Sequence, residues 1–371
     1  MNRFSLLLLS GIVGATSASA QVSLAPLNTW GGGDGWLAPG EGGYTFLGTG
    51  NNERGLAYGN GHVYLVSRNG GSFIRVLDQN TGADLSTPLN TTGVSGGTFA
   101  VNCISVGADG AIYVGNLTTQ STTSPFKVYK WATEASASVV AYTGDAGLAG
   151  SRVGDSLTAI GGGSSTRLAA GFGSTPAVAG NNSYTIVNPT ASSAAAVTLA
   201  TPPNAGDFRL GITFTDATHV LGTQGSSLYR YTSFSGTSGT LLGSPVIPDP
   251  AGASSDRLLA YSVINGLPIL AVQSIGDSHV SIYDVSNPGA PVWLASGNNT
   301  SGSLTANSNG SGQLAWGAST SLGDGRTSQV LYAMSSNQGI EAFVVTIPEP
   351  GTMSILLLGA GLLCCRRKAS A

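Results

Sequence analysis

Charged side chains are scarce in this chain of 371 residues. Asp, Glu, Lys and Arg together make up 9% of it, whereas soluble domains typically contain about 25%. Long solvated helices are built largely from Glu and Lys, so this composition argues against them. The 55 glycines, together with Thr, Val and Tyr, instead favour short strands joined by tight turns. The chain is long enough for one large domain or two ordinary ones.

A basic cluster is also missing. Between residues 21 and 347, eleven Lys and Arg stand against seventeen Asp and Glu, which gives a net charge of −6. Proteins that bind nucleic acid concentrate positive charge on one surface. The sequence therefore argues against a nucleic-acid partner.

Cysteine is almost absent. Cys364 and Cys365 lie close to the C-terminus, which leaves Cys103 alone in the main part of the chain. A disulfide within that part is excluded, and so is a Cys-rich zinc site. Because Cys103 lies in the apolar run 101–106, we expect it to be a buried small hydrophobe rather than a nucleophile.

The first twenty residues predict a secretory signal peptide. Arg3 precedes an apolar run over residues 6–13, and Ala18 and Ala20 supply the small-x-small pattern that signal peptidase cleaves, before Gln21. We therefore expect the protein to be exported, with a mature chain that begins at Gln21.

The last 25 residues form a second signal with three parts. A Pro-Glu-Pro tripeptide is followed by thirteen apolar residues, 353–365, and then by basic residues. The apolar run is shorter than the ~20 residues of a full transmembrane helix, and the basic end would stay on the cytoplasmic side. The residues that carry this pattern are Pro348, Glu349, Pro350, Arg366, Arg367 and Lys368.

This tail resembles the PEP-CTERM sorting signal of Gram-negative bacteria that make extracellular polysaccharide. The resemblance implies that an exosortase in the membrane recognises the tripeptide and removes the tail. The protein would then be held briefly at the inner membrane and released to the cell surface or beyond. A plain C-terminal membrane anchor is the alternative, and it has the same topology.

Between the two ends, one pattern of four short strands recurs. The units start near residues 54, 101, 152, 209, 257 and 303, a spacing of roughly 46 to 57 residues, and the first unit is expected to end with a strand at 84–86. Four strands in each of several such units are typical of a β-propeller. We predict an all-β domain over residues 21–346 with about six blades and almost no helix, between a signal peptide (1–20) and a sorting tail (347–371).

The last unit offers only three strands, and residues 22–27 could supply its fourth strand by pairing with residues 340–345, which would remove an open edge. Seven blades are the alternative if residues 31–53 add strands. A pair of β-sandwiches or a β-helix are competing architectures. The whole chain is also similar to an uncharacterised group of propeller proteins with PEP-CTERM tails, a resemblance that implies no known activity.

Candidate chemical groups are few. His62, His219 and His279 each precede a valine at a strand start, and they fall at different positions within their units, so we expect structural roles and no shared metal site. No residue is assigned to catalysis and no cofactor is expected. Asp145, Asp155, Asp249 and Asp256 lie near unit junctions, whereas Asp109, Asp216 and Asp277 lie in turns and are expected to form them.

Four arginines share one position, just before the first strand of a unit. In a propeller that strand is innermost, so their side chains would gather at one mouth of the central channel. They could bind an anionic ligand such as a uronate carboxylate or a phosphate, or they could pair locally with Asp and backbone carbonyls between blades. The four residues are Arg54, Arg152, Arg209 and Arg257.

The function that these observations favour is a non-catalytic binding or structural role at the surface of a polysaccharide-rich envelope, with extracellular polysaccharide as a candidate partner. A propeller enzyme, a hydrolase or lyase that acts on sugars or lactones, is the alternative. A protein-binding scaffold is a third possibility.

Overall fold

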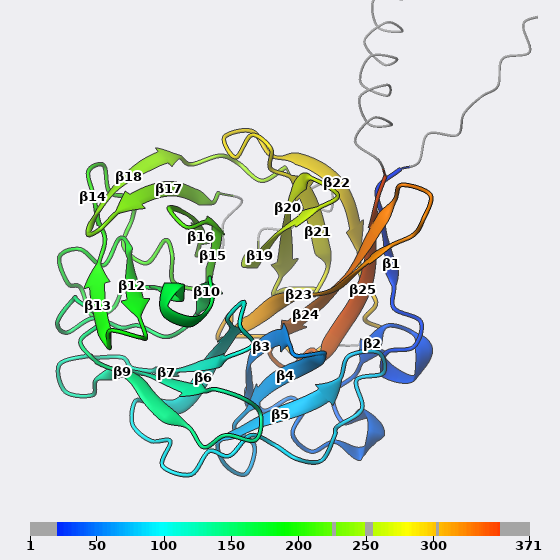
Figure 1. Cartoon of the computed structure of the whole chain (residues 1–371), viewed down its shortest axis with the longest axis horizontal. Helices are drawn as coiled ribbons and strands as arrows, with labels where there is room; N and C mark the ends of the chain where they lie inside the picture. Colours follow the sequence, from blue (N-terminus) through cyan, green and yellow to red (C-terminus); the bar gives the residue numbers. More distant parts are fainter. Residues whose placement is uncertain (1–20, 225–227, 249–254, 302–303, 349–371) are drawn as a thin grey trace, which may run out of the picture.

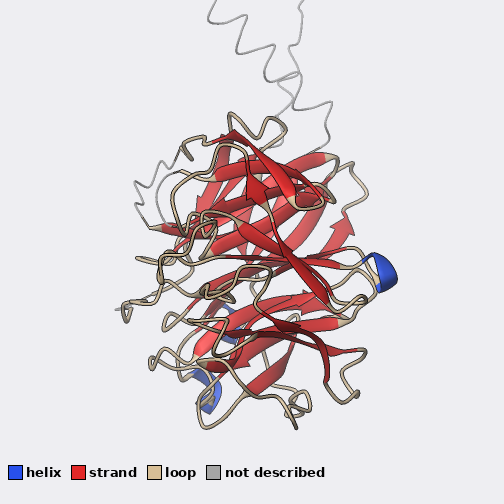
Figure 2. Ribbon diagram, turned by 90° about the vertical axis from the view of Figure 1, so that its left-hand side faces the viewer, coloured by secondary structure: helices blue, strands red, loops and turns tan. Residues whose placement is uncertain are grey.

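Six sheets, antiparallel except for one short strand, surround a central axis in the computed structural model, as Figure 1 shows from above and Figure 2 from the side. The structure describes residues 21–224, 228–248, 255–301 and 304–348. The predicted signal peptide, and the tail from Glu349 onward, lie outside these residues. Within them the helical segments are three short 3₁₀ turns, η1 (Gly31–Gly33), η2 (Glu41–Gly43) and η3 (Gly163–Ser165), and no helix is long and apolar enough to cross a membrane.

Each sheet forms one blade, with its first strand nearest the axis. Blades 1 to 3 are β3 (Glu53–Gly59), β4 (His62–Ser67) and β5 (Phe73–Asp78); β6 (Phe99–Val106), β7 (Ile112–Leu117), β8 (Phe126–Trp131) and β9 (Val139–Gly144); and β10 (Thr158–Ile160), β11 (Arg167–Gly171), β12 (Tyr184–Asn188) and β13 (Ser193–Ala196).

Blades 4 to 6 follow the same plan. They are β15 (Gly211–Asp216), β16 (His219–Thr223), β17 (Arg230–Ser235) and β18 (Ser238–Gly243), with β14 (Thr198–Leu199) parallel to β18; β19 (Asp256–Ile264), β20 (Leu267–Ser274), β21 (Val280–Asp284) and β22 (Val292–Gly297); and β23 (Gly312–Ser321), β24 (Thr327–Ser335), β25 (Ile340–Ile347) and β1 (Ser23–Pro26), with β2 (Trp36–Leu37) also paired to β25.

The N-terminal strand closes the ring. β1 pairs antiparallel with β25, with Ser23 opposite Thr346 and Leu24 opposite Val345. The first and last strands of the described chain therefore lie in one blade, at the upper right of Figure 1. This confirms the predicted pairing of residues 22–27 with 340–345, and it covers an edge of β25 that would otherwise be open.

Apolar side chains lie between the blades rather than in one central core. Among the described residues, six apolar clusters each join two neighbouring blades. Strands expose alternate side chains on their two faces, so each blade packs against both neighbours. Cys103 belongs to the cluster between blades 2 and 3 and is fully buried. Burial raises the pKa of its thiol to about 12, in line with the predicted packing role.

Asn-Gly turns join the first two strands of blades 1 and 5. Asn60 and Gly61 have φ of 54° and 79°, and Asn265 and Gly266 have φ of 53° and 78°. Two successive positive φ values define the tight hairpin turn that Asn-Gly favours. We call the end of the propeller that carries these turns the hairpin face. The opposite end, where the inner strands begin, we call the arginine face.

Several boundaries differ from the expected ones. The sixth unit begins at Gly312 rather than near 303, and β10 begins at Thr158 rather than near 152. Residues 31–53 form η1, β2 and η2 and no seventh blade. The expected strand at 84–86 is reduced to one bridge between Leu77 and Asp84, because Ser86 takes a left-handed φ of 66° and cannot continue a strand.

Candidate anion site at the arginine face

The predicted arginines lie where the inner strands begin. Arg54 is the second residue of β3, and its guanidinium donates hydrogen bonds to Asn102 Oδ1 (2.8 Å) in blade 2 and to Ser311 Oγ (2.7 Å) next to blade 6. Asn102 in turn donates from Nδ2 to the Gly154 carbonyl, 2.6 Å away. Hydrogen bonds thus connect the starts of four blade segments around this mouth.

Arg152 and Arg209 share one carboxylate. Arg152 donates from Nε and Nη2 to Asp155, both at 2.6 Å, and Arg209 donates from Nε to Asp155 Oδ2 at 3.0 Å. The Asp155 side chain is only 2% exposed. Burial on its own would raise the pKa of Asp155, but the bonds and charges of the two arginines outweigh it and hold that pKa below its usual value. This carboxylate is therefore ionised and occupied by the two guanidinium groups.

Arg257 is in a different situation. It is the second residue of β19, it has no hydrogen bond or ion pair within the described part of the chain, and its Nε is buried. Burial, and then the charge of Arg209, lower its pKa. The guanidinium lies against Gly310, where an added Cβ would clash with Arg257 Nη1. Arg257 and Arg209 thus form a pair of neighbouring positive charges with unused donors on Arg257.

A fifth arginine, which the sequence pattern did not single out, stands at the same face. Arg68 follows the end of β4, stacks on the Phe99 ring at 3.5 Å from its centroid, and donates to the Asn51 carbonyl at 2.7 Å. Burial, followed by the charge of Arg68, lowers the pKa of Arg54 to about 10. Arg54 remains charged at neutral pH. The sequence could have indicated Arg68 only by its position. It follows the second strand of a blade, and that strand runs back to the face where the first strands begin.

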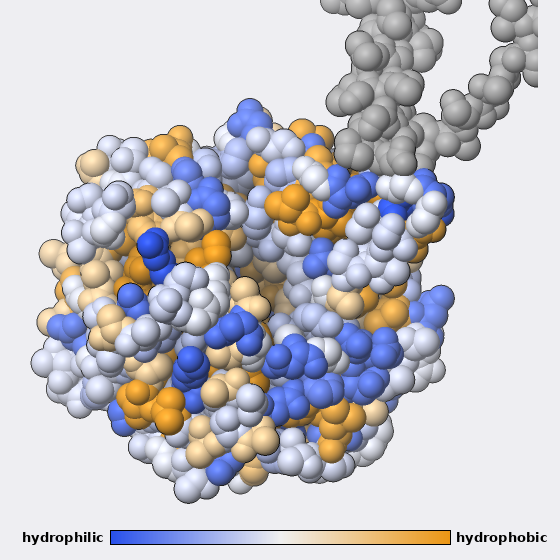
Figure 3. All heavy atoms as spheres, in the orientation of Figure 1, coloured by the Kyte–Doolittle hydropathy of each residue, from blue (hydrophilic) through white to orange (hydrophobic). Residues whose placement is uncertain are grey.

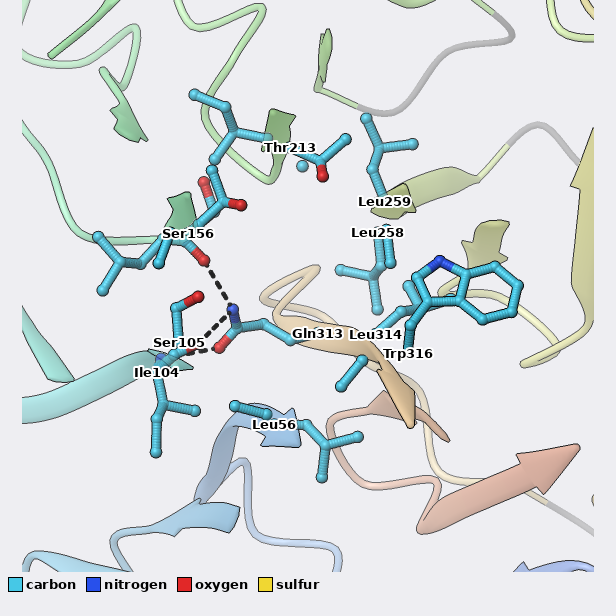
Figure 4. A pocket seen from close by; sticks show the side chains of 18 of the residues that line it. Leu56, Ile104, Ser105, Ser156, Thr213, Leu258, Leu259, Gln313, Leu314 and Trp316 are labelled. Carbon is cyan, nitrogen blue, oxygen red and sulfur yellow. Dashed lines mark hydrogen bonds between the residues drawn. The ribbon is translucent and has the colours of Figure 1, made fainter. Parts of the chain in front are cut away.

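Gln313 crosses the channel just inside this mouth. Its Nε2 donates to the carbonyls of Ile104 and Leu157, both at 3.0 Å, and its Oε1 accepts from the Ile104 amide at 2.9 Å (Figure 4). Blade 6 is thereby tied to blades 2 and 3. A cavity of about 250 Å³ lies along the axis, lined by the inner strands of all six blades, and a hollow is visible near the centre of the ring in Figure 3.

Each of the histidines contacts a carboxylate. His62 Nδ1 lies 2.6 Å from Glu134, His219 Nδ1 lies 2.8 Å from Asp216, and His279 Nδ1 lies 2.7 Å from Asp277. The three histidines belong to blades 1, 4 and 5 and do not come together. Within the described residues no group of three or more His, Cys, Asp or Glu side chains is arranged to hold a metal ion.

The predicted turn-forming carboxylates do accept backbone hydrogen bonds in their turns: Asp109 from Ala111, Asp216 from Thr218, and Asp277 from His279. Of the carboxylates expected near unit junctions, Asp155 lies at the mouth, Asp256 is buried at the start of β19, and Asp145 bonds the Gly147 amide. Asp249 lies outside the described residues.

Of the predicted processing residues, the structure describes Pro348. Its carbonyl accepts a hydrogen bond from Asn265 Nδ2 at 3.1 Å. The others, Ala18, Ala20, Glu349, Pro350, Arg366, Arg367 and Lys368, lie outside the described residues.

Two family models match the sequence. A domain of unknown function, DUF4623, matches residues 43–207, and the PEP-CTERM protein-sorting motif matches residues 346–368. No curated protein matches the chain.

Solved structures share the fold. A DUF4623 family protein from Bacteroides eggerthii is 17% identical, with a TM-score of 0.61 over 83% of this chain and 73% of that one. The major allergen Mala s 1 of Malassezia sympodialis is 11% identical, with a TM-score of 0.50 over 79% of this chain and 92% of that one. At such identities the likeness concerns architecture and carries no activity over to this chain.

Proposed function

We propose that this PEP-CTERM sorting-motif protein, an exported six-bladed propeller that contains a DUF4623 region, has a non-catalytic binding or structural role in a polysaccharide-rich envelope. Within that role, the arginine face binds an acidic group of the polymer, such as a uronate carboxylate. Signal peptidase and an exosortase are its processing enzymes.

The proposal rests on the position of Arg257, a partly buried guanidinium beside a second cation. The other three predicted arginines already use donors within the protein: Arg54 on Asn102 and Ser311, and Arg152 and Arg209 on Asp155. Arg257 has no such partner among the residues that the structure describes, although it is about half-buried beside another cation. A guanidinium with free parallel donors is well matched to a carboxylate, which it can bind through two hydrogen bonds.

An anion placed there would relieve two unfavourable terms at once. Burial first, and then repulsion from Arg209, lower the pKa of Arg257. An anion would pair the partly buried Arg257 charge and offset that repulsion. The domain as a whole is acidic, so long-range attraction of a polyanion is weak and the binding depends on this local pair. Raising the salt concentration should weaken it.

The test is a calorimetric titration of the full chain with oligogalacturonate, with a neutral dextran of similar length for comparison. Arg257→Gln should weaken oligogalacturonate binding about tenfold or more, which corresponds to about 1.4 kcal/mol, without lowering the melting temperature. Arg326→Gln is the matched control, because Arg326 is exposed and pairs with Asp324 beside the β23–β24 turn on the hairpin face.

Equal affinities for the two variants would contradict the assignment of Arg257. Arg54→Gln and Arg209→Gln should lower the melting temperature because each removes hydrogen bonds between segments. Arg152→Gln should lower it because it removes two hydrogen bonds to the buried Asp155 carboxylate. New reducing ends or unsaturated products during incubation would instead support the enzyme alternative and overturn the non-catalytic role.

A further inference from the structure

The sorting motif follows the propeller without a spacer. β25 ends at Ile347, which pairs with Thr327 of β24, and Thr346 pairs with both Ser328 and Ser23. Pro348, the first residue of the Pro-Glu-Pro tripeptide, comes next. The peptide that an exosortase must bind therefore begins one residue beyond a strand that is hydrogen-bonded on both sides.

A side chain of blade 5 holds this first residue. Asn265 is in the turn between β19 and β20, and its Nδ2 donates to the Pro348 carbonyl at 3.1 Å and to the Gly325 carbonyl at 3.0 Å. Gly325 lies in the turn between β23 and β24 of blade 6. Asn265 thus joins the turn of one blade, the turn of the next blade and the start of the sorting motif.

The hydrogen bond from Asn265 to Gly325 links two neighbouring blades, whereas the hydrogen bond to Pro348 links a blade to the sorting motif. In blade 1, Asn60 occupies the same place in the same kind of turn, and its Nδ2 donates to the Gly110 carbonyl of the blade 2 turn at 2.9 Å. It also contacts the Tyr64 hydroxyl at 3.0 Å. Among the described residues a link from an Asn-Gly turn to the next blade therefore occurs in blades 1 and 5, and at blade 5 the same side chain also holds Pro348.

Chain length fixes which face lies near the membrane while the apolar run is inserted. Residues 348–352 separate β25 from the apolar run that begins at 353, and five extended residues span at most about 17 Å. β25 runs toward the hairpin face, where Val263 and Leu322 are 55% and 42% exposed beside the Asn265 and Gly325 turns. The arginine face points in the opposite direction.

We propose that Asn265 is a latch that holds Pro348, the first residue of the sorting motif, at the hairpin face beside the turns of blades 5 and 6, and that the exosortase must open it before it can process the tail. A peptide enters the site of a processing enzyme only when its own hydrogen bonds are free. Opening the latch exchanges one amide–carbonyl hydrogen bond for contacts with enzyme or water. Asn265 is a positioning residue that lowers the fraction of chains whose motif is free at any moment, by an equilibrium worth one hydrogen bond.

The experiment compares processing rates of the full chain in a host that contains an exosortase. Newly made protein is pulse-labelled, and intact mass separates tailed from processed chains over time. Asn265→Ala should speed processing about fivefold, as expected for the loss of one hydrogen bond. Asn60→Ala, which removes the equivalent contact between turns but leaves Pro348 held, should process at the wild-type rate.

A second variant keeps every blade contact intact. A Gly-Ser-Gly-Ser insertion between Ile347 and Pro348 leaves Asn265 in place but moves the tripeptide away from it, and it should also speed processing. The latch is refuted if Asn265→Ala matches Asn60→Ala, or if the insertion leaves the rate unchanged. Neither rate depends on polysaccharide binding at the arginine face, so a failure here is distinguishable from a failure of the proposed function.

Discussion

Replacing Asp155 by asparagine should destabilise the ring more than any surface charge replacement. Asp155→Asn keeps the size of the side chain but removes the negative charge that Arg152 and Arg209 share. Breaking a buried ion pair in this way typically costs about 3–5 kcal/mol. The two arginine side chains are 22% exposed, so water recovers part of that loss, and about 3 kcal/mol is expected.

The corresponding change in melting temperature follows from the size of the domain. At about 2.1 cal/mol/K per residue over roughly 330 residues, the entropy of unfolding is about 0.7 kcal/mol/K, and the melting temperature should fall by about 4 °C. Thermal unfolding followed by circular dichroism at pH 7 measures it. Asp324→Asn is the matched control, because Asp324 and Arg326 form an exposed pair on the surface, and it should leave the melting temperature unchanged.

The pH dependence gives a second check on the same pair. The folded-state pKa of Asp155 lies below its unfolded value, so its contribution is fully present above the unfolded pKa of about 3.9 and disappears as the pH falls through the folded pKa. The difference between wild type and Asp155→Asn should be constant near neutrality and shrink below about pH 4. A melting temperature no lower than that of Asp324→Asn would refute the structural role of this carboxylate.

Two further predictions concern other buried polar groups. Gln313→Ala removes three hydrogen bonds across the channel and should lower the stability by about 2 kcal/mol, with water replacing part of the loss; denaturant unfolding measures it, and an unchanged midpoint would contradict the cross-channel tie. Burial raises the pKa of Glu341 to about 8, so the folded state holds a proton that the unfolded state releases above about pH 4.3, and stability should fall as the pH rises from there to about 8. Glu341→Gln should therefore melt higher than wild type at pH 8 to 9, and parallel pH profiles of the two proteins would refute this.

The architecture could be predicted from the sequence because it depends on local repetition. Apolar runs separated by Gly, Asn and Asp turns indicate strands and hairpins directly, and a last unit with three strands requires a fourth from elsewhere in the chain. The pairing of β1 with β25 follows from that requirement, and the structure confirms it. The same reasoning failed at Ser86 because a left-handed residue interrupts the strand, and sequence shows no preference strong enough to predict such a conformation for serine.

The site could be predicted only in part. The shared position of the four arginines predicts that their backbones lie at the mouth where the inner strands begin. Their hydrogen-bond partners cannot be predicted in the same way, because these depend on how the blades pack. Arg152 contacts Asp155 three residues away, whereas Arg209 reaches the same carboxylate across 54 residues. The Asn-Gly pair marks Asn265 as a turn residue, but nothing in the sequence indicates the contacts of Asn265 or Gln313, because their partners are backbone groups that only the closed ring brings near.

The closure of the ring also determines how the protein carries load. β25 lies between β24 and β1, and the ladder hydrogen bonds on both sides run across it. When the tail is held and the propeller body is pulled away from it, the force acts along β25 and shears both ladders together. An edge strand pulled in the same direction would be resisted by one ladder, whereas β25 is resisted by two. While the tail is attached, a pull on it is therefore taken up by a strand that is hydrogen-bonded on both sides.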